Sequence, residues 1–502
     1  MKKINKPAKN HAPHPKNSPA KSTITSQPVS PILAFPLIIL AAAIAFGPAL
    51  FFGVTAFDDD KIIGIFTGSP HRMIDAVTSN AFMEHKGQDF YRPLQSLSFM
   101  IDAAISGGGP AIYHLTNILL HAITACCLWR LLILLGFGER RSLAAALVFA
   151  VHPLFAQAVA WIPGRGDLLL GLSGIVTLAA LVKYRRSGKS RFAALTALAL
   201  FCALMAKENA LALPVLLCLY LVLLDGKRCL CRRTIALAGS WFAVSLVYIV
   251  LRKGAMSGLP GEGTFGIGPL IGNLRALPEM LAGFFVPWDI PVLPSFTLSS
   301  TIIGLCAAIL IVFALAAQDR MKPLALFGAL WYAGLLLPGM LYRQLLGAHA
   351  FTYLNHRSYL PMVGIIILLL EAVPSIGRRV SWRLLLAAGA LALVILCLLA
   401  HRQSAFFADP ITFYNQAIRT NPSSAFALNN RASLRSERGD IQGAIRDMDA
   451  ALRLDPNFPA CLLNRGILAA YVGDTAAACG MWARAAGMGN GMAEDMVKKY
   501  CK

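Results

Sequence analysis

Long apolar runs separated by short polar segments fill the chain between residues 32 and 400. The first run, 32–54, is long enough to cross the hydrocarbon core of a bilayer once. Ten further runs follow at 112–135, 142–161, 167–183, 191–206, 208–225, 233–251, 299–317, 323–341, 353–372 and 382–400. The pattern predicts an all-α, polytopic membrane domain over 32–401 with about eleven spans. Segment 270–286 either crosses the membrane or lies along its surface, and residues 94–105 predict a helix too short to span.

A different pattern begins after residue 401. Asn430 recurs as Asn464, Gly439 as Gly473 and Ala444 as Ala478, at the period of about 34 residues that is typical of tetratricopeptide repeats. We therefore expect a short α-solenoid in domain 402–502. Its predicted parts are a half repeat at 410–422 and repeats at about 425–458 and 459–492. An array this short needs packing at its ends, on the membrane domain or on a partner.

The positive charge follows the topology. The net charge of +21 would by itself suggest a nucleic-acid partner. Lys and Arg collect instead in alternate short loops, where such residues set the orientation of membrane proteins. Residues 1–31, rich in Lys, Pro, Ser and Asn, predict a disordered basic cytoplasmic tail. The asymmetry predicts a multi-pass inner-membrane protein without a nucleic-acid partner, with loop 55–111 and the repeats on the outer, periplasmic side.

Three consecutive carboxylates, Asp58, Asp59 and Asp60, open the first outer loop. Adjacent acids repel one another and are costly near lipid, so at least one should hold a cation, a proton or a polar substrate. The alternative is a solvated loop that begins with charge.

Other unusual polar residues fall at the same predicted face. His114, Asn117 and His121 form one stripe on the second span, because residues at i, i+3 and i+7 share a helix face. The remaining residues lie at the outer ends of other spans: His152, Arg165, Asp167, Lys207, Glu208, His356 and Arg357. Each has an ordinary explanation as a helix–helix hydrogen bond, an interfacial ion pair or a turn cap. Their joint placement favours a polar cavity open to the outer leaflet, suited to an anionic lipid headgroup and a hydroxyl acceptor.

Several of these stretches resemble a known family. The stretches are AFDDDK at 56–61, YRPL at 91–94, YHLTNILLH at 113–121, HP at 152–153, AVAWI at 158–162, GRGDLL at 164–169, KE at 207–208 and RSYLP at 357–361. They resemble the transmembrane-and-tetratricopeptide protein O-mannosyltransferases, which belong to the C-type (GT-C) glycosyltransferases. The resemblance implies a GT-C-like helical bundle and a paired-acid motif within Asp58–Asp60, with Asp58 and Asp59 favoured. This chain has far fewer repeats than the animal members.

The resemblance implies transfer of mannose or a similar hexose from a polyprenyl-phosphate donor to a hydroxyl acceptor, expected to be protein Ser or Thr. A carboxylate, Asp58 or Asp59, would take the acceptor proton. Cations would stabilise the departing phosphate. The donor-phosphate candidates are Arg357, Arg165, Lys207 and Arg92. The substrate-pocket candidates are His114, Asn117, His121, His152, Asp167, Glu208 and His356.

The partners expected from this chemistry are a membrane lipid-linked sugar, acting as co-substrate, and an acceptor protein or glycan, which the repeats could help to bind. No cofactor is required, although the adjacent acids Asp58 and Asp59 could hold a divalent metal. Two other classes fit parts of the sequence. A non-catalytic membrane-anchored repeat scaffold for envelope proteins would explain the C-terminus. A transporter of lipid-linked sugar would need polar groups that continue to the inner side.

Overall fold

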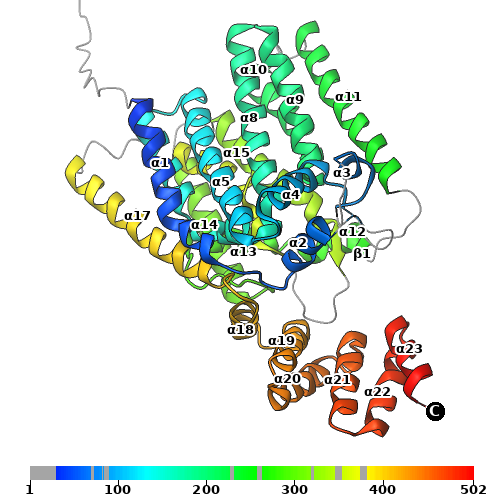
Figure 1. The fold of residues 1–502 in the computed structure, drawn as a ribbon. Coiled ribbons are helices and arrows are strands. Elements are labelled where there is room, and N and C mark those ends of the chain that lie inside the picture. The colour runs from blue at the N-terminus through cyan, green and yellow to red at the C-terminus, as the bar shows by residue number, and fades with distance from the viewer. Residues whose placement is uncertain are drawn as a thin grey trace, which may run out of the picture.

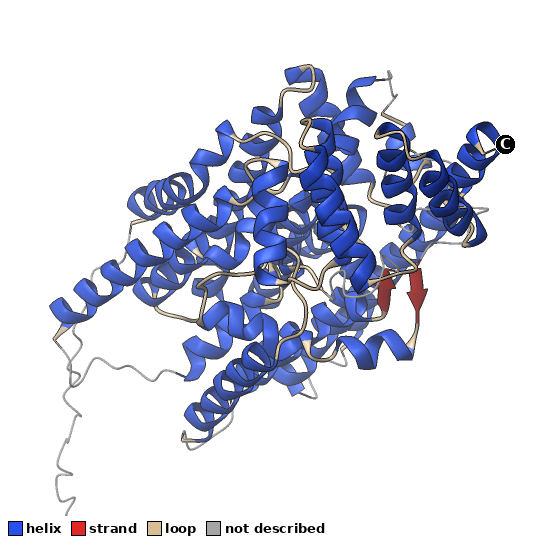
Figure 2. Cartoon of the chain, turned by 90° about the horizontal axis from the view of Figure 1, so that it is seen from below, coloured by secondary structure: helices blue, strands red, loops and turns tan. Residues whose placement is uncertain are grey.

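In the computed structural model the chain forms a bundle of long helices, followed by a row of shorter helices below it (Figure 1). The structure describes residues 30–501 except 69–72, 82, 84–89, 227–230, 257–262, 318–321, 345–352 and 373–380. The predicted basic tail therefore lies outside the described residues except for its last two positions. Within the described part, the short strands β1 (Gly263–Phe265) and β2 (Tyr342–Gln344) pair with each other in antiparallel orientation, and the other elements are helices (Figure 2). The all-α prediction is confirmed apart from this short pair of strands, which lie far apart in the sequence.

Seven described helices are long and apolar enough to cross a membrane, or eight if one bent pair counts as a span. The seven are α1 (Pro31–Phe46) with η1 (Gly47–Phe51), α5 (Pro110–Leu134), α8 (Arg165–Ser187) with η3 (Ile162–Gly164), α11 (Arg232–Ala255), α14 (Leu298–Ala316), α15 (Pro323–Met340) and α17 (Trp382–Ala405). The bent pair is α6 (Glu139–Val151) with η2 (Pro153–Phe155) and α7 (Ala156–Ala160). The chain is thus a multi-pass membrane protein.

Three shorter apolar helices occupy the remaining predicted runs. They are α9 (Ser190–Ala206), η4 (Glu208–Ala212) with α10 (Leu213–Asp225), and α16 (Met362–Ala372), which follows η6 (Asn355–Ser358). An apolar helix therefore lies in each predicted run, whereas eleven crossings stay a prediction. Segment 270–286 forms two short helices, α12 (Ile267–Asn273) and α13 (Ala276–Phe285), and neither has the length of a span.

Glycines allow two of the closest helix contacts in the bundle. A Cβ on Gly304 of α14 would lie 1.7 Å from the Pro278 carbonyl oxygen of α13. A Cβ on Gly364 of α16 would lie 2.3 Å from the Gly328 carbonyl oxygen of α15. Small residues at such crossings bring helix backbones together and strengthen packing between spans, where lipid removes the hydrophobic driving force.

The described part of the loop at 55–111 forms three short helices, α2 (Asp59–Gly68), α3 (Asp75–Thr78) and α4 (Pro93–Ser106). The helix predicted at 94–105 corresponds to α4. It buries Gln95, Phe99 and Asp102, which share one face at i, i+4 and i+7. That face packs against α5 and α8, so α4 holds the loop onto the bundle.

The C-terminal helices are α18 (Pro410–Thr420), α19 (Ala425–Glu437), α20 (Ile441–Leu454), α21 (Pro459–Tyr471), α22 (Thr475–Gly487) and α23 (Gly491–Tyr500). Helices α19 with α20 and α21 with α22 pack as pairs. Asp440 and Asp474 occupy equivalent positions and each accepts a hydrogen bond from a backbone N–H in the first turn of the next helix. The helices follow the predicted repeat bounds, and their assignment to the tetratricopeptide class stays a prediction.

The junction between the two parts differs in detail from the predicted boundary at 401/402. Helix α17 continues through that boundary to Ala405. Helix α18 buries Phe413, Tyr414 and Ala417 in the same hydrophobic core as the membrane helices. The short array is therefore packed onto the membrane domain at its first helix.

Candidate active site

The acid triplet lies where the turn after the first span enters α2, whose first two residues are Asp59 and Asp60. Asp59 is buried, and its carboxylate accepts hydrogen bonds from the Thr55 amide at 2.7 Å, the Thr55 hydroxyl at 2.9 Å and the Phe57 amide at 3.2 Å. Burial raises the pKa of Asp59 to about 6, although the hydrogen bonds from Thr55 and Phe57 oppose the shift. Asp59 thus closes the turn that begins α2.

The two acids beside Asp59 differ from it in exposure. Asp58 and Asp60 are exposed, whereas Asp59 is buried. Asp58 has a φ of 73°, a left-handed conformation that Asp tolerates better than most residues. This turn directs successive side chains of the triplet to opposite sides, so the two favoured acids, Asp58 and Asp59, occupy different environments.

Aromatic side chains connect the acid turn to the bundle and to the C-terminal helices. Phe57 stacks on Trp161 with ring centroids 5.2 Å apart and on Phe413 of α18 at 5.4 Å. The Trp161 indole donates a hydrogen bond to the Phe57 carbonyl at 2.8 Å. Trp161 also contacts the His356 ring, with the ring centroids 5.2 Å apart. Trp161 therefore connects the acid turn to a second polar cluster.

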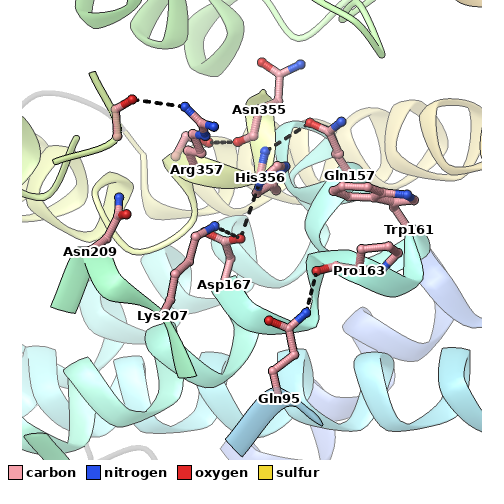
Figure 3. Close-up of polar contacts among 12 residues, drawn as sticks. Gln95, Gln157, Trp161, Pro163, Asp167, Lys207, Asn209, Asn355, His356 and Arg357 are labelled. Carbon is pink, nitrogen blue, oxygen red and sulfur yellow. Dashed lines mark hydrogen bonds and ion pairs between the residues drawn. The ribbon is translucent and has the colours of Figure 1, made fainter. Parts of the chain in front are cut away.

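That cluster, here called the charged cluster, consists of Arg92, Asp167, Lys207, Glu208, His356 and Arg357. Lys207 Nζ lies 2.6 Å from Asp167 Oδ2, and His356 Nε2 lies 3.7 Å from the same oxygen (Figure 3). Arg92 binds Glu208 through two hydrogen bonds, of 2.6 and 3.0 Å. The ends of four distant segments thus bring three cations and two carboxylates together, an excess of one positive charge that favours an anionic ligand.

Arg357 differs from the other cations in its surroundings. Its Nη1 donates a 3.2 Å hydrogen bond to the Gly339 carbonyl, and it interacts electrostatically with Asp167 and Glu208. It is half-buried and lines a narrow cleft, with a free volume of only about 10 Å³, that has Asn273, Gly339 and Tyr353 among its walls. Lys207, by contrast, is nearly inaccessible beside Asp167. Arg357 and the partly exposed Arg92 are therefore the cations that a ligand can reach.

Arg165 lies in the packed interior. Its guanidinium pairs with Asp102 at 2.5 Å and donates to the Asn117 side chain and the Tyr113 carbonyl, both at 2.8 Å. It also lies over the Phe99 ring at 4.4 Å and is fully buried. These contacts use the guanidinium to join α4, α5 and α8. The structure therefore gives Arg165 a structural position and does not support its predicted contact with the donor phosphate.

The polar stripe on α5 is also internal. The Asn117 amide donates to the Val159 and Trp161 carbonyls at 3.3 Å, and His121 contacts the Tyr359 hydroxyl at 2.7 Å and the Ala150 carbonyl at 3.0 Å. Such bonds are those expected of polar groups that join membrane helices. For these side chains the geometry favours the helix-contact alternative over a sugar pocket.

Two other predicted histidines also contact backbone. His114 Nε2 lies 3.3 Å from the Gly53 carbonyl, and His152 Nε2 lies 3.0 Å from the Phe284 carbonyl. Both side chains are buried. Neither therefore lines the cleft beside Arg357.

Three residues that complete the site were not singled out as site residues from the sequence. Asp102 neutralises Arg165, Gln157 accepts a 3.1 Å hydrogen bond from the His356 amide, and Trp161 contacts both Phe57 of the acid turn and His356 of the charged cluster. A signal for Asp102 exists, because an acid on the apolar face of 94–105 requires a buried partner. Gln157 carries no such signal, and Trp161 stands out only as part of the stretch AVAWI that resembles the family.

No group of three or more His, Cys, Asp or Glu side chains placed to hold a metal ion occurs among the described residues. In the acid turn, the Asp59 oxygens already accept hydrogen bonds from Thr55 and Phe57.

The long apolar helices and the charged cluster at their ends define a multi-pass membrane protein with a polar site beside its C-terminal helices. Its sequence is similar to human protein O-mannosyl-transferase TMTC3 (30% identity over 195 residues, 37% of this chain and 21% of the relative). It is also similar to human TMTC2 (43% over 95 residues, 19% and 11%) and Drosophila melanogaster Tmtc1 (36% over 131 residues, 26% and 15%). The resemblance to these O-mannosyl-transferases is confirmed, and the chain spans between 11% and 21% of the length of these three relatives.

No protein-family model matches the chain. Among solved structures, the oligosaccharyltransferase of Archaeoglobus fulgidus, with a tethered acceptor peptide, aligns with a TM-score of 0.48 at 12% identity. That alignment covers 78% of this chain and 58% of the other.

Proposed function

We propose that this protein is a membrane glycosyltransferase that moves mannose or a similar hexose from a polyprenyl-phosphate donor to a protein hydroxyl at the outer face of the membrane. The similarity to proteins named O-mannosyl-transferases supports the reaction class. The observation that carries the proposal is that Trp161 contacts both Phe57 of the acid turn and His356 of the charged cluster.

In this reaction the acceptor oxygen attacks the anomeric carbon of the sugar. The bond between that carbon and the phosphate oxygen breaks, the hydroxyl proton moves to a carboxylate, and polyprenyl phosphate departs with the bonding electrons. Asp58 is the proposed base, because it is exposed and its neighbour Asp59 is already occupied by hydrogen bonds from Thr55 and Phe57. Asp59 then acts as a positioning residue that fixes the turn.

Arg357 is the proposed contact for the donor phosphate, with Arg92 beside it. A guanidinium can offer paired N–H donors to phosphate oxygens, and preorganised positive charge stabilises the charge that develops on the leaving group. Lys207 and Asp167 form a buried ion pair that adds to the local field and positions His356. The cleft beside Arg357 has apolar residues such as Ala276, Met280 and Leu336 in its walls, and it must widen to admit a lipid-linked donor.

A protein acceptor is favoured by the position of the C-terminal helices. Helix α18 contacts the acid turn directly, since Tyr414 donates a 3.1 Å hydrogen bond to the Ala56 carbonyl and Phe413 stacks on Phe57. A polypeptide held by the following helices would reach the triplet without crossing the membrane domain.

The test uses the full chain in lipid nanodiscs with a panel of labelled polyprenyl-phosphate sugars and a Ser/Thr-rich acceptor protein. Mass spectrometry of the acceptor should detect an added hexose, and release of polyprenyl phosphate should match it. Asp58→Asn should lower the rate by about 10²–10⁴-fold, the contribution of a general base. Asp60→Asn removes an equally exposed neighbouring charge and should stay within about twofold of the unaltered protein.

Wild-type rates in Asp58→Asn would remove the base assignment. Failure to use any polyprenyl-phosphate sugar would favour the non-catalytic scaffold instead. A well-folded protein that binds acceptor proteins through its C-terminal helices, without turnover, would identify that alternative.

A further inference from the structure

A cavity with charged walls lies among the ends of four membrane helices. One of these ends, that of α10, lies at the end of the bundle opposite the C-terminal helices (Figure 1). The cavity is formed where α5 and α10 end, α8 nears its end and α15 begins, and its volume is about 330 Å³. Its lining residues are Leu134, Leu135, Val182, Arg185, Arg186, Tyr220, Leu224 and Leu324. No step of the proposed transfer reaction uses it.

Two arginines supply the charge of this cavity, and no acidic residue is among its lining residues. Arg185 lies over the Tyr220 ring, with its guanidinium carbon 5.4 Å from the ring centroid, and it also contacts the Tyr220 side chain through a hydrogen bond. Arg186 donates to the Leu134 carbonyl at the end of α5. Because a guanidinium has five N–H donors, Arg186 keeps further donors after this bond.

The remaining walls are apolar. Five of the eight lining residues are Leu or Val, and they belong to four different helices. A cavity with two cations at its mouth and aliphatic walls between helix ends combines the requirements of a phosphate group and of acyl chains. Its volume lies within the range of about 300–1,000 Å³ that small-molecule sites occupy.

We propose that this cavity binds the headgroup of an anionic phospholipid in the leaflet on that side of the membrane. The phosphate contacts Arg185 and Arg186, and the upper part of the acyl chains lies along Leu224 and Leu324. The position at helix ends, where headgroups meet the hydrocarbon core, favours a bilayer lipid over a soluble anion. This site is separate from the charged cluster and does not depend on the proposed transferase activity.

Native mass spectrometry of the full chain, released from nanodiscs that contain phosphatidylglycerol and phosphatidylcholine with identical acyl chains, tests the proposal. We expect the protein to retain phosphatidylglycerol preferentially. Arg185→Gln combined with Arg186→Gln should reduce that retention by about tenfold or more, the loss expected when a charge-assisted hydrogen bond is removed. The matched control, Lys189→Gln with Arg191→Gln, removes two exposed charges nearby and should retain the lipid.

A second variant keeps both arginines and fills the cavity. Leu224→Trp should displace the lipid while it leaves the surface charge unchanged, so it tests the cavity even if the arginine variant folds poorly. Thermal unfolding of each variant in detergent reports whether the fold is intact.

The proposal would be overturned by equal retention of phosphatidylcholine, by equal loss in the matched control, or by unchanged retention in both cavity variants. Two further measurements would contradict a site for a bilayer phospholipid. Displacement by millimolar inorganic phosphate would identify a free-anion site, and preferential retention of polyprenyl phosphate, when it is added to the nanodiscs, would assign the cavity to the donor lipid.

Discussion

Three identical residues in a row acquire different environments in this protein. Asp59 is buried and its carboxylate accepts hydrogen bonds from Thr55 and Phe57, whereas Asp58 and Asp60 are exposed. The left-handed conformation at Asp58 causes the difference, because it turns the chain between the first two acids. Residue type alone therefore does not decide which carboxylate is available to a substrate.

The raised pKa of Asp59 predicts a pH dependence of stability. Its pKa increases from 3.8 in an ordinary environment to about 6 in the folded protein, because burial disfavours the charged form. The folded state then binds the proton more tightly than the unfolded state, so this contribution to stability is complete below about pH 4 and is lost as the pH rises through about 6. The free energy of unfolding should fall across that window by on the order of 3 kcal/mol.

Denaturant unfolding in detergent at a series of pH values measures this slope. Asp59→Asn cannot titrate and should flatten it, whereas Asp60→Asn should keep the slope of the unaltered protein. An equal slope in all three proteins would mean that Asp59 titrates normally.

Arg165 and Arg357 should respond differently to substitution. Arg165→Met leaves Asp102 buried without its partner and should lower the free energy of unfolding by about 3–5 kcal/mol. Arg357→Gln removes a half-buried group with one backbone bond and should change stability little, while transferase activity falls by about 10²–10³-fold. Unfolding and rate measurements on the same preparations separate the two roles. Similar losses of stability in both variants would contradict the distinction.

At the scale of elements, α18 joins the C-terminal helices to the acid turn. Its Arg419 forms an ion pair with Asp289, which lies after α13, and its Gln416 donates to the same carboxylate at 3.1 Å. Its Phe413 packs between Phe57 and Phe407. Because these contacts come from three separate segments, the orientation of α18 is fixed by the membrane domain.

Truncation of that aromatic contact should loosen the acid turn. Phe413→Ala removes a buried ring, at a cost of about 3–5 kcal/mol, and should increase amide hydrogen exchange across residues 55–60 by at least tenfold. Trp482→Ala removes an equally buried ring in α22 and should leave exchange at 55–60 unchanged. Equal effects of the two variants would show that the acid turn does not depend on α18.

At the scale of the whole molecule, cysteine chemistry offers a test of orientation. A disulfide joins Cys479 to Cys501 in the C-terminal helices, and Cys231 at the start of α11 is an exposed free thiol. Disulfides persist in oxidising compartments, which agrees with the predicted outer placement of that domain. Cys231 belongs to a basic loop predicted to face inward.

A membrane-impermeant maleimide should therefore label Cys231 only after cells are permeabilised. Peptide mapping by mass spectrometry identifies the labelled thiol, and Cys231→Ser provides the control. Labelling of Cys231 in intact cells would reverse the predicted orientation.

The sequence by itself determined the helical membrane domain, the position of each apolar helix, the non-spanning helix at 94–105 and the helix pairs after residue 401. These features follow from local periodicity and length, because hydrophobic runs and repeat spacing are written along the chain. It also identified the polar residues that gather near one end of the bundle, since charged groups in apolar surroundings are conspicuous.

Only the tertiary structure decided which of those residues can meet a ligand. Arg165 and Arg357 look alike in the sequence. In the structure Arg165 forms a buried ion pair with Asp102, whereas Arg357 faces a cleft. The physical reason is that the fate of a charge depends on partners from distant segments, and the sequence pattern around either arginine does not specify them. The same holds for Asp58 and Asp59, which a single backbone turn separates into an exposed and a buried acid.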